Sequence, residues 1–143
     1  MEASVRQFFE RYESVFNRAL GGDIDMDEVA GLYASEFVAA SPGGVMAGKN
    51  DNQLKQAMVQ GYARYRAIGT KAMRLRSVRL SRIDDHHCVA HVAWMATYAR
   101  ENRPDATIDF DVHYFVQTLN GAPKVFGWVS GDEQALLREH GII

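Results

Sequence analysis

The alternation of residue types along residues 106–119 constrains this chain more than any other feature. The segment reads ATIDFDVHYFVQTL, and successive side chains of a β-strand point to opposite faces of its sheet. One face of the predicted strand carries Ile108, Phe110, Val112, Tyr114 and Val116. The other face carries Asp109, Asp111, His113 and Phe115. Such a strand belongs either to a sheet with one wet face or to the wall of a pocket between a sheet and helices.

Four other segments repeat their apolar residues at the spacing of an α-helix. The first begins at Ser4 and ends at Gly21-Gly22, where glycine terminates the run. The predicted helices cover residues 4–20, 25–33, 50–69 and 130–141. Their expected N-terminal caps are Ser4, Asp25, Asn50 or Asp51, and Ser130.

After Gly69 the period changes from helical to alternating, which indicates a run of strands. A slip of phase near Arg76-Ser77 predicts a bulge, and Asn120-Gly121 predicts a hairpin. Residues 100–105 read as a polar loop. The predicted strands cover residues 37–41, 45–47, 71–83, 87–99, 106–119 and 124–129. The order of elements predicts an α+β fold, with three helices on a curved antiparallel sheet and a short fourth helix.

Composition excludes several classes of protein. The 143 residues are 47% hydrophobic and 24% charged, which is typical of one globular domain. A net charge of −2 gives no overall field to attract nucleic acid, and no apolar run approaches the ~20 residues that span a membrane. Cys88 is the only cysteine, so no disulfide forms within the chain, and we expect a cytoplasmic protein.

Several stretches together are similar to a known superfamily. They are FFERYESVFNRAL, GGDIDMDEVAGLYASEFVAASPGG, GKNDNQLKQ, DVHYFVQTLNGAPKV and the closing FGWVSGDEQALLREHG. The chain resembles the nuclear transport factor 2-like superfamily, which includes ketosteroid isomerases, SnoaL-like polyketide cyclases and limonene epoxide hydrolases. The resemblance implies one cystatin-like α+β roll over residues 1–143, with a conical pocket between the sheet and the helices. Fold membership does not determine activity, because this fold carries different chemistries.

The resemblance also suggests positions for site residues. Tyr12, in an Arg-Tyr pair, falls where ketosteroid isomerases carry the tyrosine of their oxyanion hole. Ser41, before Pro42, falls where those isomerases carry an aspartate base. A serine does not accept a proton at neutral pH, so steroid isomerisation by that mechanism is not expected. Asp111 or His113 falls near the second acid of the oxyanion hole.

His113 is the candidate acid or base, because an imidazole titrates near neutral pH. Asp111 would orient it or share its proton, and Tyr12 would donate to a developing oxyanion. In this hypothesis the polar row of residues 109–115 lines the pocket, and the apolar row lies outside, covered by a homodimer. The alternative is a polar row in solvent and an apolar row in the core. Expected ligand-binding residues are Ser41, Tyr62, Trp94, Tyr98, Phe115 and Trp128.

Two further clusters favour ordinary surface roles. His86, His87, Cys88 and His91 match no zinc spacing, and a turn explains the first two, so we expect no metal. Five basic residues on one strand lack a stacking motif for RNA and suit a solvated or dimer-facing strand. These are Lys71, Arg74, Arg76, Arg79 and Arg82.

The sequence therefore predicts a protein that binds a small organic molecule of unknown identity, without a cofactor. It leaves two functions open. One is an isomerase or cyclase that works by proton transfer in the pocket. The other is a non-catalytic ligand carrier or a protein-interaction and assembly domain.

Overall fold

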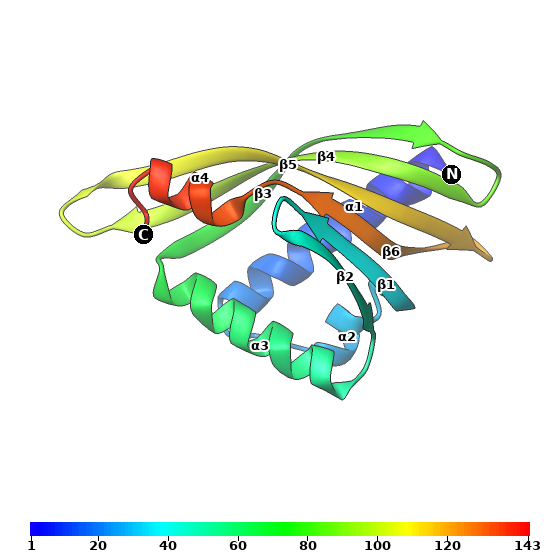
Figure 1. The fold of residues 1–143 in the computed structure, drawn as a ribbon, viewed down its shortest axis with the longest axis horizontal. Helices are drawn as coiled ribbons and strands as arrows, with labels where there is room; N and C mark the ends of the chain where they lie inside the picture. Colours follow the sequence, from blue (N-terminus) through cyan, green and yellow to red (C-terminus); the bar gives the residue numbers. More distant parts are fainter.

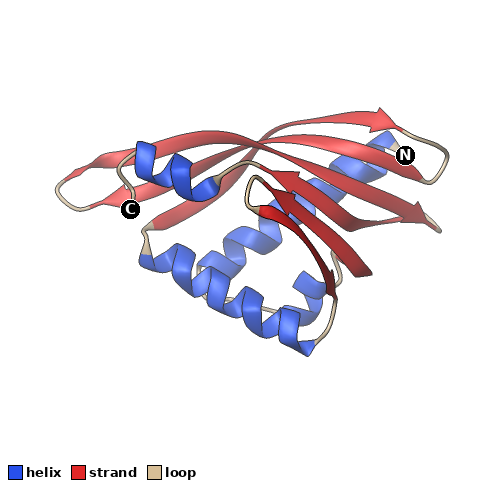
Figure 2. Ribbon diagram, viewed as in Figure 1, coloured by secondary structure: helices blue, strands red, loops and turns tan.

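The fold is an α+β roll in which helices lie against one face of a curved six-stranded sheet (Figures 1 and 2). The computed structural model describes all 143 residues. The helices are α1 (Glu2–Leu20), α2 (Met26–Ala30), α3 (Asn52–Ala67) and α4 (Glu133–Glu139). The strands are β1 (Tyr33–Ser41), β2 (Gly44–Lys49), β3 (Thr70–Arg82), β4 (His87–Arg100), β5 (Arg103–Leu119) and β6 (Ala122–Ser130). The predicted α+β class and order of elements are confirmed.

The strands lie in the order β2-β1-β6-β5-β4-β3. Every neighbouring pair is antiparallel except β1 with β6, which run parallel. The sequence predicted a wholly antiparallel sheet, because the period of a strand does not report its direction. The parallel pair forms because the chain leaves β1 through β2 and α3, builds the other end of the sheet, and returns in β6.

Helix α1 crosses the inner face of the sheet and supplies much of the core (Figure 2). Its apolar stripe includes Val5, Phe8 and Phe9, each no more than 1% exposed. The Phe9 ring lies 5.0 Å from the Tyr114 ring of β5, measured between centroids. Burying side chains of this size contributes roughly 1.5–3 kcal/mol each, so α1 is fixed to the sheet chiefly by its apolar face.

Polar side chains of α1 also bind the backbone of the edge strand β3. The Asn17 side chain accepts a hydrogen bond from the Met73 amide at 2.9 Å and donates to the Met73 carbonyl at 2.7 Å. The Glu13 carboxylate accepts from the Leu75 amide. The register of β3 against β4 shifts between Leu75 and Ser77, which confirms the predicted bulge. Helix α1 thus satisfies edge groups that no further strand pairs.

Three local expectations differ from the structure. Helix α1 begins at Glu2, and the Ser4 hydroxyl donates back to the Met1 carbonyl instead of capping the helix. The cap of α4 is Asp132, which accepts from the Ala135 amide, so Ser130 stays in β6. The predicted polar loop over residues 100–105 is mostly strand, because the β4–β5 hairpin turns tightly after Arg100 and continues the ladder beyond β3.

The turn between α3 and β3 requires a glycine. Gly69 has φ of +90°, and a Cβ built on it would lie 2.6 Å from the Ala99 carbonyl oxygen. We expect Gly69→Ala to lower the free energy of unfolding by about 1–2 kcal/mol, because an alanine is strained in the left-handed conformation. The contact of its Cβ with the Ala99 carbonyl oxygen should lower it further. Urea denaturation measures this. Gly131→Ala is the matched control, since a Cβ there meets nothing within 4 Å, and equal losses in both variants would contradict the expectation.

Candidate functional site

A cavity of about 600 Å³ lies between the inner face of the sheet, α1, α3 and the start of α4. This volume is within the range of small-molecule sites. Of its 23 lining residues 16 are hydrophobic, so the ligand it suits is largely apolar. The aromatic walls are Tyr12, Phe16, Tyr33, Tyr62, Tyr65, Trp94, Tyr98, Phe110, Tyr114 and Trp128.

The inner end of the cavity holds a group of hydrogen-bonded phenols. The Tyr12 and Tyr33 hydroxyls lie 2.8 Å apart, and the Trp94 indole N–H donates to the Tyr114 hydroxyl at 3.2 Å. Burial raises the pKa of Tyr12, Tyr33 and Tyr114, and hydrogen bonds from Tyr33 and Tyr114 oppose the rise at Tyr12. All three phenols therefore stay protonated at neutral pH and act as donors, not as bases.

The hydroxyl groups of Tyr12, Tyr33 and Tyr114 do not use all of their protons in hydrogen bonds within the protein. The Trp94 N–H can only donate, so it uses an acceptor site of Tyr114 and none of the phenol protons. The Tyr12–Tyr33 hydrogen bond uses one of the three O–H protons, and the interaction of Tyr12 with Tyr114 uses at most one more. At least one O–H proton is therefore left to donate to an oxygen of a ligand.

The rim of the cavity is acidic. Asp109, Asp111, Asp132 and Glu133 belong to its lining, which contains no lysine, arginine or histidine. The Tyr65 hydroxyl donates to Glu133 at 3.5 Å. Burial and then the Glu133 charge raise the pKa of Tyr65, and the same two causes raise the pKa of Tyr98 to about 12. The Glu133 carboxylate therefore raises the pKa of two tyrosines of the cavity wall.

Most of the residues expected in the pocket line it, and three do not. The residues that line it are Tyr12, Tyr62, Trp94, Tyr98, Asp111 and Trp128. Ser41 lies exposed at the β1–β2 turn, where its hydroxyl accepts from the Gly43 amide at 3.2 Å. Phe115 lies on the outer face of the sheet, 5.9 Å from the Phe126 ring between centroids. Ser41 is thus a turn residue, and Phe115 belongs to a different surface.

His113 also lies outside the cavity, so the hypothesis that the polar row of its strand lines the pocket is wrong, and the alternative with the apolar row in the core agrees with the structure. Tyr114 and Val112 line the cavity, so the alternation of β5 turns His113 to the outer face. There its Nδ1 lies 2.7 Å from Nδ1 of His91, its neighbour on β4. Asp111 belongs to the same outward row as His113, and it borders the cavity only at the edge of β5, which β6 leaves open beyond Val112.

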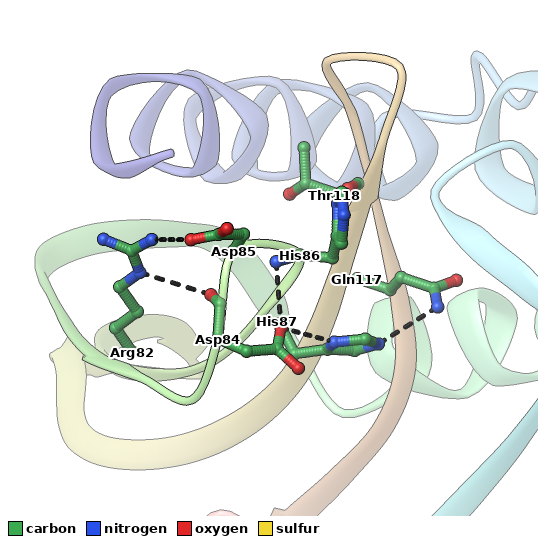
Figure 3. A network of polar contacts seen from close by, with 7 residues as sticks. All are labelled: Arg82, Asp84, Asp85, His86, His87, Gln117 and Thr118. Carbon is green, nitrogen blue, oxygen red and sulfur yellow. Dashed lines mark hydrogen bonds and ion pairs between the residues drawn. The ribbon is translucent and has the colours of Figure 1, made fainter.

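The remaining histidines of the predicted cluster serve the β3–β4 turn and its neighbour strand (Figure 3). His87 lies between Asp84 and Gln117, with Nδ1 2.7 Å from the carboxylate and Nε2 3.1 Å from the amide nitrogen. The His86 amide donates to the same carboxylate at 2.9 Å, and Arg82 binds the Asp84 carbonyl. No three His, Cys, Asp or Glu side chains come together in a way that could hold a metal ion.

Some lining residues were assigned other roles in the sequence. Tyr33 and Tyr65 fell within the helices predicted over residues 25–33 and 50–69, and Glu133 fell within the one predicted over residues 130–141. In the structure Tyr33 opens β1, and all three border the cavity. A helical or capping pattern explains such a residue completely, so periodicity gives no signal that it also meets a ligand.

Sequence and structure comparisons agree on the family. Residues 2–133 match the sequence family described as NTF2-like protein (DUF6841). The chain belongs to this family. No curated protein matches it by sequence. The description of this family as NTF2-like agrees with the resemblance to the nuclear transport factor 2-like superfamily, and solved structures share the expected cystatin-like fold. No helix of this family member is long and apolar enough to cross a membrane.

Three solved structures illustrate the likeness. An NTF2-like protein with a cystatin-like fold from Novosphingobium aromaticivorans is 10% identical, with a TM-score of 0.70 over 99% of this chain and 88% of that one. A candidate scytalone dehydratase from the same organism is 11% identical, with a TM-score of 0.65 over 90% and 80%. A candidate polyketide cyclase from Xanthomonas campestris is 16% identical, with a TM-score of 0.55 over 96% of each chain. At these identities the likeness establishes the fold alone.

His91 makes the stability of the protein depend on pH. Burial, then Arg79 and His113, lowers the pKa of His91 below its ordinary value of 6.5. Below about pH 6.5 the unfolded chain therefore binds a proton that folded His91 does not, so the stability present above this pH is lost as the pH falls. We expect His91→Gln to reduce this loss, measured by urea denaturation between about pH 7.5 and pH 5. His140→Gln, at an exposed helix end, is the control, and an unchanged slope for His91→Gln would contradict the assignment.

Proposed function

We propose that this protein binds a small, largely apolar organic molecule with an oxygen acceptor in the cavity. The observation that carries the proposal is the aromatic cavity of about 600 Å³ whose inner end holds a free phenol proton. Apolar walls supply most of the affinity, and a few polar groups set the orientation of the ligand. Two structural neighbours that bear the names polyketide cyclase and scytalone dehydratase support a carbon-rich ligand.

In the enzymatic form of this proposal, Tyr12 donates to a ligand oxygen that gains negative charge, as in an isomerase or cyclase. A neutral phenol in a site from which water is excluded stabilises such an oxyanion. His113 takes no part, because its ring lies on the other face of the sheet.

The second candidate is a ligand carrier without catalysis. One observation favours it: the polar groups at the inner end are phenols and an indole, and none of them is a base at neutral pH. Both candidates require the ligand in the same cavity. They differ only in whether the ligand is released unchanged, so a binding experiment tests what they share.

Prodan, a neutral naphthalene ketone whose fluorescence reports its surroundings, is the probe for this cavity. We expect saturable binding with a blue-shifted emission. Gly61→Leu should abolish binding, because a Cβ at Gly61 of α3 meets nothing within 4 Å and the position lines the cavity. Ala63→Leu, on the exposed side of the same helix, is the control. Leucine favours a helix over glycine by ~0.8–1 kcal/mol, so a loss of binding in Gly61→Leu does not reflect unfolding.

The donor role of Tyr12 has a separate test with the same probe. We expect Tyr12→Phe to weaken prodan binding about 2- to 10-fold, the net worth of one hydrogen bond of about 0.5–1.5 kcal/mol. Unchanged affinity in Tyr12→Phe would contradict the donor role. Unchanged affinity in Gly61→Leu would contradict the cavity as the binding site.

We further propose that the protein acts as a cytoplasmic homodimer through the outer face of its sheet. On this face Val38 of β1 and Val129 of β6 are 47% and 40% exposed, and half-buried Phe126 and Phe115 lie on β6 and its neighbour β5. The register joins Val38, Gly127 and Phe115 in one row across three strands. A continuous apolar strip of this kind on a sheet suits a second copy of the same strip.

A charge on this face tests the dimer. We expect Val129→Glu to give a monomer by sedimentation velocity, because a buried, unpaired carboxylate costs several kcal/mol in an apolar interface. Val59→Glu is the matched control, since Val59 is 39% exposed but lies on α3, away from the outer face of the sheet. Equal behaviour of the two variants would overturn this interface.

A further inference from the structure

Helix α4 forms part of the cavity wall, together with the residues that join it to β6. The lining residues of this segment are Ser130, Gly131, Asp132, Glu133, Leu136 and Leu137. All lining residues that are exposed lie either in this segment or in residues 109–111. The mouth of the cavity therefore lies between the start of α4 and the edge of β5.

Few polar contacts hold α4 to the rest of the protein. Ser130 is the last residue of β6 that pairs with β5. From Gly131 onward, no residue forms an ion pair, and no backbone hydrogen bond leaves the segment. One side-chain hydrogen bond joins residues 131–143 to another element, from the Tyr65 hydroxyl of α3 to Glu133 at 3.5 Å. This bond lies at the mouth of the cavity.

The apolar attachment of α4 is a small cluster. Leu137 is the only fully buried side chain of the helix, and it packs with Ala96, Tyr98 and Ile108 of the sheet. The core that holds α1 to the sheet is a separate and larger cluster. A segment opens locally at low cost where few apolar contacts and hydrogen bonds are lost. Helix α4 can thus leave the sheet while the main core stays folded.

Gly131 gives the chain a place to turn between β6 and α4. It is exposed, and a Cβ built on it would meet nothing within 4 Å, so no neighbour restricts this residue. Asp132 follows as the cap of α4 and belongs with the helix. Hinges are commonly a few residues at the end of an element, and glycine has the widest range of backbone angles. Rotation at this one residue can carry the whole helix.

We propose that α4 is a lid over the mouth of the cavity, hinged at Gly131 and held closed by the Tyr65–Glu133 hydrogen bond. This inference rests on the proposed function, that the cavity binds a small organic molecule. A ligand enters while the lid is open, and Leu136 and Leu137 then close over it. Closure separates the ligand from water and retains it in the site.

Hydrogen exchange tests the motion without a ligand. We expect the amides of α4 to exchange faster than those of α1 and β4, because opening of the lid needs no unfolding of the core. Tyr65→Phe should speed exchange in α4 about 2- to 10-fold, the effect of losing one hydrogen bond, and leave β4 unchanged. Exchange of α4 only at the rate of global unfolding would overturn the lid.

Stopped-flow measurements with prodan test what the lid does. Loss of the Tyr65–Glu133 bond favours opening equally in the free and the ligand-bound protein. Tyr65→Phe should therefore raise the rates of binding and release together, by about 2- to 10-fold, and barely change the affinity. Glu133→Ala should act alike, and the double variant should be no faster than either single variant, since both remove one bond. Glu139→Ala, an exposed carboxylate of α4 outside the cavity, is the matched control.

A cross-link provides the converse test. In Tyr65→Cys/Glu133→Cys, a bismaleimide joins α3 to the start of α4, while Cys88 is buried and does not meet the reagent. We expect the cross-linked protein to take up prodan roughly tenfold more slowly than the same protein before cross-linking, because the lid cannot open. Unchanged rates after cross-linking would overturn the lid while prodan binding still upheld the proposed function. Failure of the unaltered chain to bind prodan would instead refute the cavity as a binding site, and hydrogen exchange would still decide whether α4 opens.

Discussion

The attachment of α1 to the edge strand β3 determines most of this structure. Asn17 binds both backbone groups of Met73, and Glu13 binds the amide of Leu75 at the bulge. These contacts and the phenylalanine stripe fix α1 across one part of the inner face. Helix α3 lies farther from this part of the sheet (Figure 2), and aromatic side chains of the sheet, α1 and α3 line the space between them. The cavity is the part of the inner face that α1 does not fill.

The cavity separates its polar groups by depth. At the buried end, removal from water keeps the phenols neutral and leaves them as donors. At the exposed end, contact with water lets carboxylates keep their charge without a partner. The same lining thus offers a neutral donor and a negative charge at opposite ends.

Periodicity predicted the elements and the bulge, but it could not predict which face of β5 turns inward. Both rows of that strand hold side chains that a pocket can use, and the choice depends on long-range partners. Tyr114 contacts Trp94 on β4 and Tyr12 on α1, so its row of side chains on β5 faces inward. His113 belongs to the opposite row and therefore lies outside the cavity. The resemblance to a known superfamily predicted the position of Tyr12 correctly, because a residue on α1 depends little on strand register. Glu133 could not be found in this way, since its role at the rim depends on where β6 ends.

Gly61 leaves space in this cavity at a cost in the stability of α3. A glycine inside a helix costs about 1 kcal/mol relative to alanine, and here nothing within 4 Å requires it. Stability alone would thus favour any larger residue, while the space for a ligand favours glycine. Among related sequences, glycine at this position would mark the members that still use the full cavity. Members with a larger residue would have a more stable helix and a smaller space for a ligand.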